Sequence, residues 1–413
     1  MRPTISIDLG AAYTKIAIRR EPDSDSNLLS HEKFRLDDLH VCIPTIAAWR
    51  KSDDRWVFGD DAQDLVPSDD IYVFRNWKPL LFTPPEESLD PNSALGRMFY
   101  QSLHSATVHC KVENLAAGYF RWLLREMLPY MIGDQPCTDP VLRISVPDFA
   151  EDLDYDCEIE QILQKAGWNS PRVRTAPEPV TNLIGALSDG KNYMRDDNPD
   201  LADTGKILAE SGLTLAPSQE EPFHILSVDI GAYTTDFAVF EIKDGFGTTL
   251  PPCRSQSAPF GIEMLDNLVK HGLAPRKGDL LGTLSSLDRE SFRRCVYTEE
   301  RTWSCNEQTF GEGNEMPIIE KCINGMSTRI SNEVDEFLSA CDVSRLDVAI
   351  FTGGGSNIPR ITRNLANRLA SKQVTTFLSS SLPENFPGAR RLSQSVIRGA
   401  SAIGGASVIF GEN

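Results

Sequence analysis

The 413-residue chain is 40% hydrophobic, enough for a sizeable core and two lobes, and its 9 cysteines contain no CxxC pair, which argues against a zinc site or a disulfide framework. Its formal net charge of −18 disfavours a non-specific nucleic-acid binder, whose affinity would come from basic residues. No apolar run reaches membrane-spanning length, and Asp8 and Lys15 interrupt any signal-peptide pattern at the start, so we expect a cytoplasmic protein without a membrane partner.

The first predicted element is a strand, turn and strand over residues 5–18, ISIDLGAAYTKIAI. Asp8 stands where the apolar strand ends, and Gly10 follows in the turn. An acid and a glycine in such a turn suit a metal-bound phosphate, because the acid orders the cation's water shell and the turn offers backbone N–H groups. An ordinary hairpin with a polar turn is the alternative.

The next part of the chain alternates predicted strands with turns. Residues 19–37 are polar and irregular, and strands are expected at 42–49 and 55–58. Residues 59–62, GDDA, predict a turn that opens a short helix, and residues 73–78, VFRNWK, end this block.

Helices then become frequent. Apolar spacing predicts a helix over 114–131, a strand at 141–146 and a helix over 151–166. Val173 marks a short strand, and residues 180–187 form a small-residue helix.

Residues 188–222 differ in character, because they are acidic and dotted with glycine and proline. We expect an insertion or lid between two structural halves and a site of partner contact. A plain solvated linker is the alternative.

The first hairpin pattern recurs at residues 224–240. The sequences ISIDLGAAYTKIAI and LSVDIGAYTTDFAV align so that Asp8 matches Asp229 and Gly10 matches Gly231, while Lys15 falls opposite Asp236. A repeat at this separation predicts two similar halves. Two such hairpins facing one another would bracket a polyphosphate from both sides.

The remaining chain continues the alternation. Residues 260–271 predict a glycine turn and an amphipathic helix, and further helices are expected at 288–295 and 316–341 within otherwise mixed sequence. A strand at 348–352 leads into the glycine-rich residues 353–357. Helices at 358–370 and 394–410 follow, and the last is rich in glycine and alanine, which suits close packing.

Five motifs in order resemble the signatures of the actin, sugar-kinase and heat-shock-chaperone ATPase superfamily. They lie at residues 8–10, 177–187, 229–236, 351–359 and 396–406. Within the superfamily the sequence most resembles the nucleotide-binding domain of the DnaK-type heat shock protein 70. The segments that carry this resemblance are 43–45 (IPT), 59–62, 73–78, 144–149 (ISVPDF), 178–179, 260–267 and 354–359 (GGSNIP).

The resemblance implies an α/β, two-lobed actin-like ATPase fold, made of duplicated ribonuclease-H-like domains with a nucleotide cleft between them. Lobe I would span 1–187, with subdomain IB at about 38–110, and lobe II would span 223–413, with a reduced subdomain IIB at about 267–315. The helix at 394–410 would cross back toward lobe I. The peptide-binding domain of a full chaperone is not expected.

The resemblance also implies ATP and Mg²⁺ in that cleft. Asp8 and Asp229 would order the waters of the Mg²⁺ ion, and Glu178 and Asp236 would lie in or near the same water network. Lys78 would approach the γ-phosphate and orient the attacking water. The nucleotide itself would be held by Gly10, Ala11, Ala12, Tyr13, Lys15, Gly231, Ala232, Tyr233, Thr234, Glu290, Arg293, Arg294, Gly353, Gly354, Gly355, Ser356, Asn357 and Ile358.

Two departures from the family pattern bear on catalysis. Ala11 stands where the family prefers a hydroxyl, although Lys15 occupies a position at which actins place a lysine on the phosphates. Tyr233 stands within the glycines of the second loop, and its ring would preserve the loop if it pointed away from the nucleotide and change the geometry if it pointed inward. ATP binding is therefore predicted more firmly than fast hydrolysis.

The expected function is that of a heat-shock-chaperone-like ATPase, which binds ATP with Mg²⁺, hydrolyses it slowly and couples it to lobe closure on or with a protein partner. An actin- or MreB-like filament-forming ATPase is one alternative, which Lys15 supports. A nucleotide-sensing scaffold with little turnover is another, which Ala11 and Tyr233 favour. A sugar kinase is less favoured, because no sugar pocket or catalytic-base motif is evident.

Overall fold

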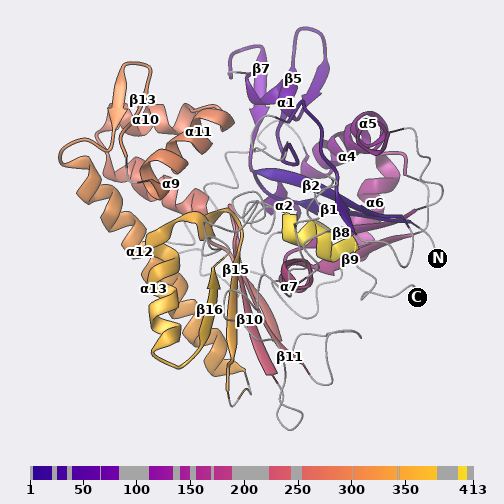
Figure 1. Cartoon of the computed structure of the whole chain (residues 1–413). Coiled ribbons are helices and arrows are strands. Elements are labelled where there is room, and N and C mark those ends of the chain that lie inside the picture. Colours follow the sequence, from indigo (N-terminus) through magenta and orange to yellow (C-terminus); the bar gives the residue numbers. More distant parts are fainter. Residues whose placement is uncertain are drawn as a thin grey trace.

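A computed structural model of the chain describes residues 3–20, 26–34, 40–65, 67–82, 111–133, 140–148, 155–168, 172–187, 223–242, 254–299, 301–341, 343, 345–378 and 399–406. These residues form an α/β protein with two large mixed sheets, as Figure 1 shows, so the expected class is confirmed. The predicted insertion at 188–222 lies outside the described residues.

The first sheet has the strand order β3-β2-β1-β8-β9, with β4 paired to β2. Its central strand β1 is antiparallel to β2 and parallel to β8, and every residue of β1 is buried. A strand covered on both faces favours the apolar run found in the sequence. The strands are β1 (Thr4–Leu9), β2 (Tyr13–Arg19), β3 (Asn27–Leu28), β4 (Ile43–Pro44), β8 (Val141–Val146) and β9 (Val173–Pro177).

The second sheet repeats this arrangement with the order β12-β11-β10-β15-β16. Its central strand β10 is antiparallel to β11 and parallel to β15, as β1 is to β2 and β8. The sequence repeat thus corresponds to equivalent central hairpins in two sheets of like topology. The strands are β10 (Phe223–Ile230), β11 (Thr235–Ile242), β12 (Arg254–Ala258), β15 (Val348–Thr352) and β16 (Thr375–Leu378).

The single strand expected at 42–49 is wrong. The structure has two short strands there, β4 (Ile43–Pro44) on the first sheet and β5 (Ala47–Arg50) in a separate three-stranded sheet with the order β6-β5-β7. Pro44 has no N–H to donate to a ladder, and this interrupts the pairing. The other two strands of the small sheet are β6 (Arg55–Phe58) and β7 (Ile71–Phe74).

Helices of the first half cover its large sheet (Figure 1). The helix expected at 114–131 is present with a π-helical stretch at Leu123–Met127 in its middle. The helix expected at 151–166 is described from Tyr155 onward. The helices are α1 (Asp60–Gln63), α2 (Lys78–Leu81), α4 (Val112–Trp122), α5 (Leu128–Ile132), α6 (Tyr155–Lys165) and α7 (Glu178–Leu187).

The second half has two long helices on its sheet and a smaller group beyond them (Figure 1). The sequence expected only a mixed region with one helix at 288–295, whereas the structure has two helices, a π-helical turn at Arg293–Thr298 and a hairpin. The elements are α9 (Ile262–Gly272), α10 (Pro275–Thr283), α11 (Ser286–Phe292), β13 (Trp303–Cys305), β14 (Gln308–Phe310), α12 (Glu315–Ala340) and α13 (Pro359–Ala370).

Buried apolar side chains form two main clusters, one from residues 5–173 and one from residues 226–374. Helix α7 lies between the sheets and contacts β8 and β9 of the first and β10, β11, β12 and β15 of the second. Residues 399–406 are helical and pack on α7 so closely that a Cβ on Gly185 would lie 1.8 Å from the Ala400 carbonyl oxygen. The small-residue pattern of both helices therefore reflects their contact.

The last described helix also bonds to the first sheet. Arg19 Nε donates a hydrogen bond of 2.8 Å to the Ala406 carbonyl, and Arg143 Nη1 donates one of 2.5 Å to the Gly405 carbonyl. Within the described ranges, no helix has both the length and the apolar character needed to cross a membrane.

Candidate nucleotide site

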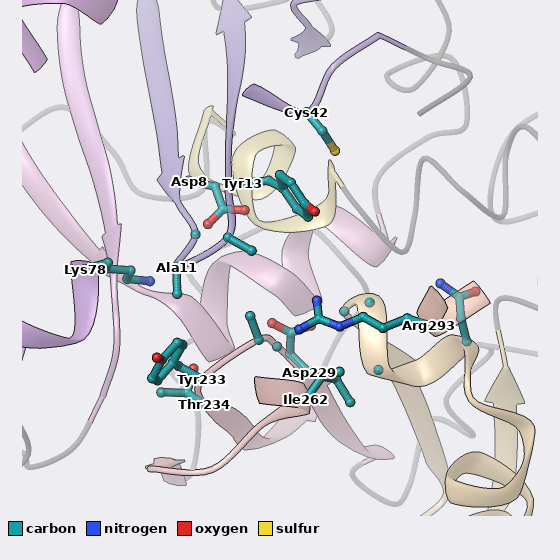
Figure 2. Close-up of a pocket in the computed structure, with 18 of the residues that line it drawn as sticks. Asp8, Ala11, Tyr13, Cys42, Lys78, Asp229, Tyr233, Thr234, Ile262 and Arg293 are labelled. Atoms are coloured by element: carbon teal, nitrogen blue, oxygen red, sulfur yellow. The ribbon is translucent and has the colours of Figure 1, made fainter. Parts of the chain in front are cut away.

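A pocket of about 480 Å³ lies between the two halves, where the turns of the duplicated hairpins meet (Figure 2). Of the residues that the sequence assigned to a site, all line this pocket except Asp236 and Ser356. They come from elements far apart in the chain, which include the two hairpin turns, the starts of α2 and α7, the turn after β15 and the π-helical turn after α11.

The two hairpins carry different charge pairs at one equivalent position. Asp8 is the cross-strand partner of Lys15 in the first hairpin, whereas Asp229 is the cross-strand partner of Asp236 in the second. Lys15 Nζ lies 2.9 Å from Asp8 Oδ2 and forms an ion pair with it. Burial alone would lower the pKa of Lys15, but the Asp8 carboxylate raises it above the usual value. Lys15 is therefore charged and faces the pocket.

Asp229 is held by neutral donors. Asn182 Nδ2 donates to Asp229 Oδ2 at 2.9 Å, and Thr352 Oγ1 donates to Asp229 Oδ1 at 3.0 Å. Burial and, after it, the negative charge of Asp8 raise the pKa of Asp229 to about 6. The two aspartates thus repel one another across the pocket, which a bound cation would relieve.

Asp236 was expected in or near the water network of the Mg²⁺ ion, but it does not line the pocket. It is 1% exposed and accepts hydrogen bonds from the hydroxyls of Ser257 and Thr234, the latter at 3.0 Å. Burial and the nearby charges of Glu178 and Asp229 raise its pKa well above the usual range. Its contact with the pocket passes through Thr234, which does line it.

Lys78 and Glu178 form a buried ion pair in the pocket wall. Lys78 begins α2 and Glu178 begins α7, and each residue is 5% exposed. Burial raises the pKa of Glu178 even though the Lys78 ammonium group opposes that shift. The Lys78 ammonium also lies 5.9 Å from the centre of the Phe82 ring.

Tyr233 belongs to the loop between β10 and β11. Its side chain is buried and lines the pocket. Figure 2 shows Tyr233 on the same side of the pocket as Lys78, with Arg293 on the opposite side. Burial raises the pKa of the Tyr233 hydroxyl, so it remains protonated.

The side of the pocket near Arg293 contains a compact ionic cluster. Arg293 Nη2 lies 2.5 Å from Glu263 Oε1 and 2.6 Å from Asp266 Oδ2, so this guanidinium forms ion pairs with two acids of α9. Burial alone would raise the pKa of Glu263, but Arg289 and Arg293 lower it to about 2. Arg294 is exposed and has no ion pair among the described residues, which leaves it as the available cation beside Glu290.

The turn after β15 has a conformation that suits glycine. Gly353 has φ +80°, and a Cβ there would lie 2.3 Å from Asp229 Oδ1. Gly354 lines the pocket, and a Cβ added there would meet nothing within 4 Å. Ser356 does not line the pocket and instead donates a hydrogen bond of 2.7 Å to the Gly353 carbonyl.

Several lining residues escaped the sequence prediction. Asn182 lies one helical turn after Glu178, so the i, i+4 spacing on α7 could have indicated it. The others carry no comparable signal, because each reaches the pocket only through the fold; they are Cys42, Pro79, Phe82, Pro147, Ile262, Thr298 and Glu299.

In the part of the chain that the structure describes, no group of three or more His, Cys, Asp or Glu side chains is placed to hold a metal ion directly. No protein-family model matches the chain, and a comparison with curated proteins found no match.

Proposed function

We propose that the chain is an ATP-binding protein of the actin-like, two-lobed kind, with the nucleotide and Mg²⁺ in the pocket between its halves. One observation carries this proposal. Two sheets of like strand order each present the turn of an equivalent hairpin to a single pocket, and each turn follows an aspartate at the end of a buried strand. A duplicated clamp of this form suits a chain of phosphates.

The charges and backbone of the pocket support a polyphosphate ligand. Lys15 and Lys78 both face the pocket, and each is already paired with one acid. The open turn at Gly354 and the available Arg294 lie apart from the two hairpin turns in the sequence and suit a nucleoside, with Gly354 allowing close approach and Arg294 offering a planar cation to a base.

The acids of the pocket fit a hydrated Mg²⁺ ion. Asp8 and Asp229 both line the pocket, and the raised pKa of Asp229 reflects carboxylate repulsion that a divalent cation would offset. Magnesium keeps several waters and needs few protein ligands, so the lack of a three-acid cluster in the described residues agrees with binding through water. When bound, the ion would neutralise phosphate oxygens.

Slow hydrolysis coupled to closure of the two halves, on or with a protein partner, is the activity we propose. Lys78 is held by Glu178 at the pocket wall, where an ammonium group can stabilise the charge of a transferred phosphoryl group. The chaperone-like character and the partner rest on the sequence resemblance.

A nucleotide-sensing scaffold with little turnover is a second candidate. The observation in its favour is that Tyr233, in the second hairpin turn, lines the pocket and is buried, so a bulky side chain is packed within that loop. Such a protein would bind nucleotide and close without releasing phosphate at an appreciable rate.

Calorimetry on the purified full chain tests the proposal. ATP with Mg²⁺ should bind, and chelation of the metal should weaken binding. Asp229→Ala should abolish or strongly weaken it, whereas Asp279→Ala, which changes an exposed acid outside the pocket, should not. Wild-type protein that binds no ATP, or an Asp229→Ala variant that binds as tightly as wild type, would contradict the proposal. Phosphate release then separates the ATPase from the scaffold.

A further inference from the structure

A reciprocal pair of hydrogen bonds joins the two halves at Asp148 and Ser257. Asp148 follows β8 of the first sheet, and Ser257 lies on β12, the edge strand of the second sheet. Ser257 N donates a hydrogen bond of 2.6 Å to the Asp148 carbonyl, and Asp148 N donates one of 2.8 Å to Ser257 Oγ. An edge strand has N–H groups that its own sheet does not use, and one of them here binds the first half.

The hydroxyl of Ser257 also reaches an acid of its own sheet. Ser257 and Asp236 are cross-strand partners on β12 and β11, so their side chains lie close together. Ser257 Oγ donates a hydrogen bond to Asp236 Oδ1 while it accepts the one from Asp148 N. The hydroxyl therefore connects the Asp236 carboxyl group to the main chain of the other half.

The second oxygen of Asp236 is held from the pocket wall. Thr234 Oγ1 donates to Asp236 Oδ2 at 3.0 Å, and Thr234 lines the pocket. Asp236 is 1% exposed and Ser257 is 5% exposed, so water has little access to replace these partners. With a partner on each oxygen, the carboxyl group has one preferred orientation. A continuous series of hydrogen bonds thus runs from Thr234 through Asp236 and Ser257 to Asp148.

We propose that Ser257 is a positioning residue, which holds Asp236, and through it Thr234, in the orientation used for ATP hydrolysis while the two halves are in contact. This inference rests on the ATPase function proposed above. Separation of the halves at Asp148 would remove one partner of the Ser257 hydroxyl and release its hold on Asp236. Neither Ser257 nor Asp236 lines the pocket, so the effect should fall on the rate of hydrolysis rather than on the affinity for ATP.

Ser255 is a matched control on the same strand. Its hydroxyl donates a hydrogen bond to Asp148 Oδ2, so it also contacts the first half. Among the described residues, however, the hydroxyl groups that bond to Asp236 are those of Ser257 and Thr234. Ser255→Ala therefore removes a serine hydroxyl and a bond between the halves but leaves both partners of Asp236 in place.

Phosphate release at saturating ATP and Mg²⁺, compared with ATP affinity from calorimetry on the same full-length protein, tests the role of Ser257. Ser257→Ala should slow release about tenfold and leave the dissociation constant of ATP within about twofold of wild type, as expected for the loss of one positioning hydrogen bond. Ser257→Cys should behave in the same way, because a thiol is a weak donor, and it changes the volume little. Ser257→Thr, which keeps the hydroxyl, and Ser255→Ala should both release phosphate within about twofold of the wild-type rate.

A second measurement needs no nucleotide. The Asp148 N–H loses its acceptor in Ser257→Ala, so its hydrogen exchange should be faster than in wild type. The same amide should exchange at the wild-type rate in Ser255→Ala, since Ser255 bonds to the side chain of Asp148 and not to its N–H.

The outcomes separate this inference from the proposed function. If wild type binds and hydrolyses ATP but Ser257→Ala and Ser257→Cys release phosphate at the wild-type rate, Ser257 has no positioning role. An equal loss of rate in Ser255→Ala, or unchanged exchange of the Asp148 amide in Ser257→Ala, would also overturn it. Wild type that binds ATP without hydrolysing it leaves the nucleotide site standing and rules out this role. Wild type that binds no ATP contradicts the proposed function itself, and the inference fails with it.

Discussion

Lys78 and Glu178 stand 100 positions apart in the sequence and form an ion pair inside the wall of the pocket. Each side chain is 7% exposed, so water cannot readily replace either partner. Removal of one member of a buried pair leaves an uncompensated charge, which costs more than the pair itself contributes. Lys78→Met should therefore lower the free energy of unfolding by about 3 kcal/mol in urea titrations near pH 8, because it leaves the buried Glu178 carboxylate without its counter-ion.

The loss in Lys78→Met should be smaller at lower pH, since burial already raises the pKa of Glu178 and this carboxyl can take up a proton there. A group whose pKa is raised in the folded state stabilises it fully below the unfolded pKa and loses that contribution as pH rises through the folded pKa. The defect of Lys78→Met should thus widen between about pH 6 and pH 8, whereas Glu178→Gln, which has no carboxyl to titrate at this position, should show no such widening. Equal losses for Lys78→Met at both ends of this range would contradict the assignment.

We expect replacement of Asp229 by asparagine to raise the free energy of unfolding and to weaken ligand binding. Its folded pKa is about 6, above the ordinary value of 3.8, so the folded state binds a proton more tightly than the unfolded state between these values. Above that window the charged form carries the full cost of burial. Asp229→Asn should therefore unfold with a free energy about 1–2 kcal/mol higher than wild type near pH 7.5, with a gain that disappears toward pH 4.

The same variant should bind ATP with Mg²⁺ more weakly, because the charge that costs stability is the one that would attract the cation. Asp279→Asn serves as the control and should change neither property, since Asp279 is exposed and outside the pocket. If Asp229→Asn proves less stable than wild type near pH 7.5, the raised pKa does not describe the folded protein.

Arg294 should contribute to ligand binding without contributing to stability. It lines the pocket, is exposed and has no ion pair among the described residues, whereas Arg293 beside it is fixed by Glu263 and Asp266. Arg294→Ala should weaken ATP binding by roughly fivefold, as expected for one stacking or hydrogen-bonding cation, and leave the unfolding midpoint unchanged. Arg301→Ala, at a side chain 75% exposed and outside the pocket, should alter neither value. Equal binding by the two variants would remove Arg294 from the site.

The central strand of each large sheet, β1 or β10, could be predicted from the sequence. Burial on both faces favours an unbroken apolar run, which is seen before Asp8 and before Asp229. Short edge strands could not, since β3 has two residues and its pairing depends on neighbours rather than on its own pattern. Pro44 was visible in the sequence and was the available signal that the strand at 42–49 is divided.

Contacts within the site depended on tertiary structure in the same way. The family resemblance predicted that Arg293 lies in the site. It could not predict that Arg293 is hydrogen-bonded to Glu263 and Asp266, because these residues lie about thirty positions away and follow no local periodicity. The hydrogen bonds that Asn182 and Thr352 donate to Asp229 likewise join residues that only the fold brings together. Residue types could indicate which groups meet a ligand, and the structure was needed to show which are already engaged with the protein.

We expect substitution of Gly353 to affect mainly stability and substitution of Gly354 to affect mainly ligand binding. Gly353→Ala would place a Cβ 2.3 Å from Asp229 Oδ1 in a left-handed backbone conformation, so we expect a loss of roughly 3 kcal/mol in the free energy of unfolding. Gly354→Ala meets nothing within 4 Å in the protein and should unfold within about 0.5 kcal/mol of wild type. Gly354 lines the pocket, however, so we expect the added methyl group to weaken adenosine-nucleotide binding in calorimetry. A Gly354→Ala variant that binds ATP as tightly as wild type would show that the nucleoside does not approach this turn.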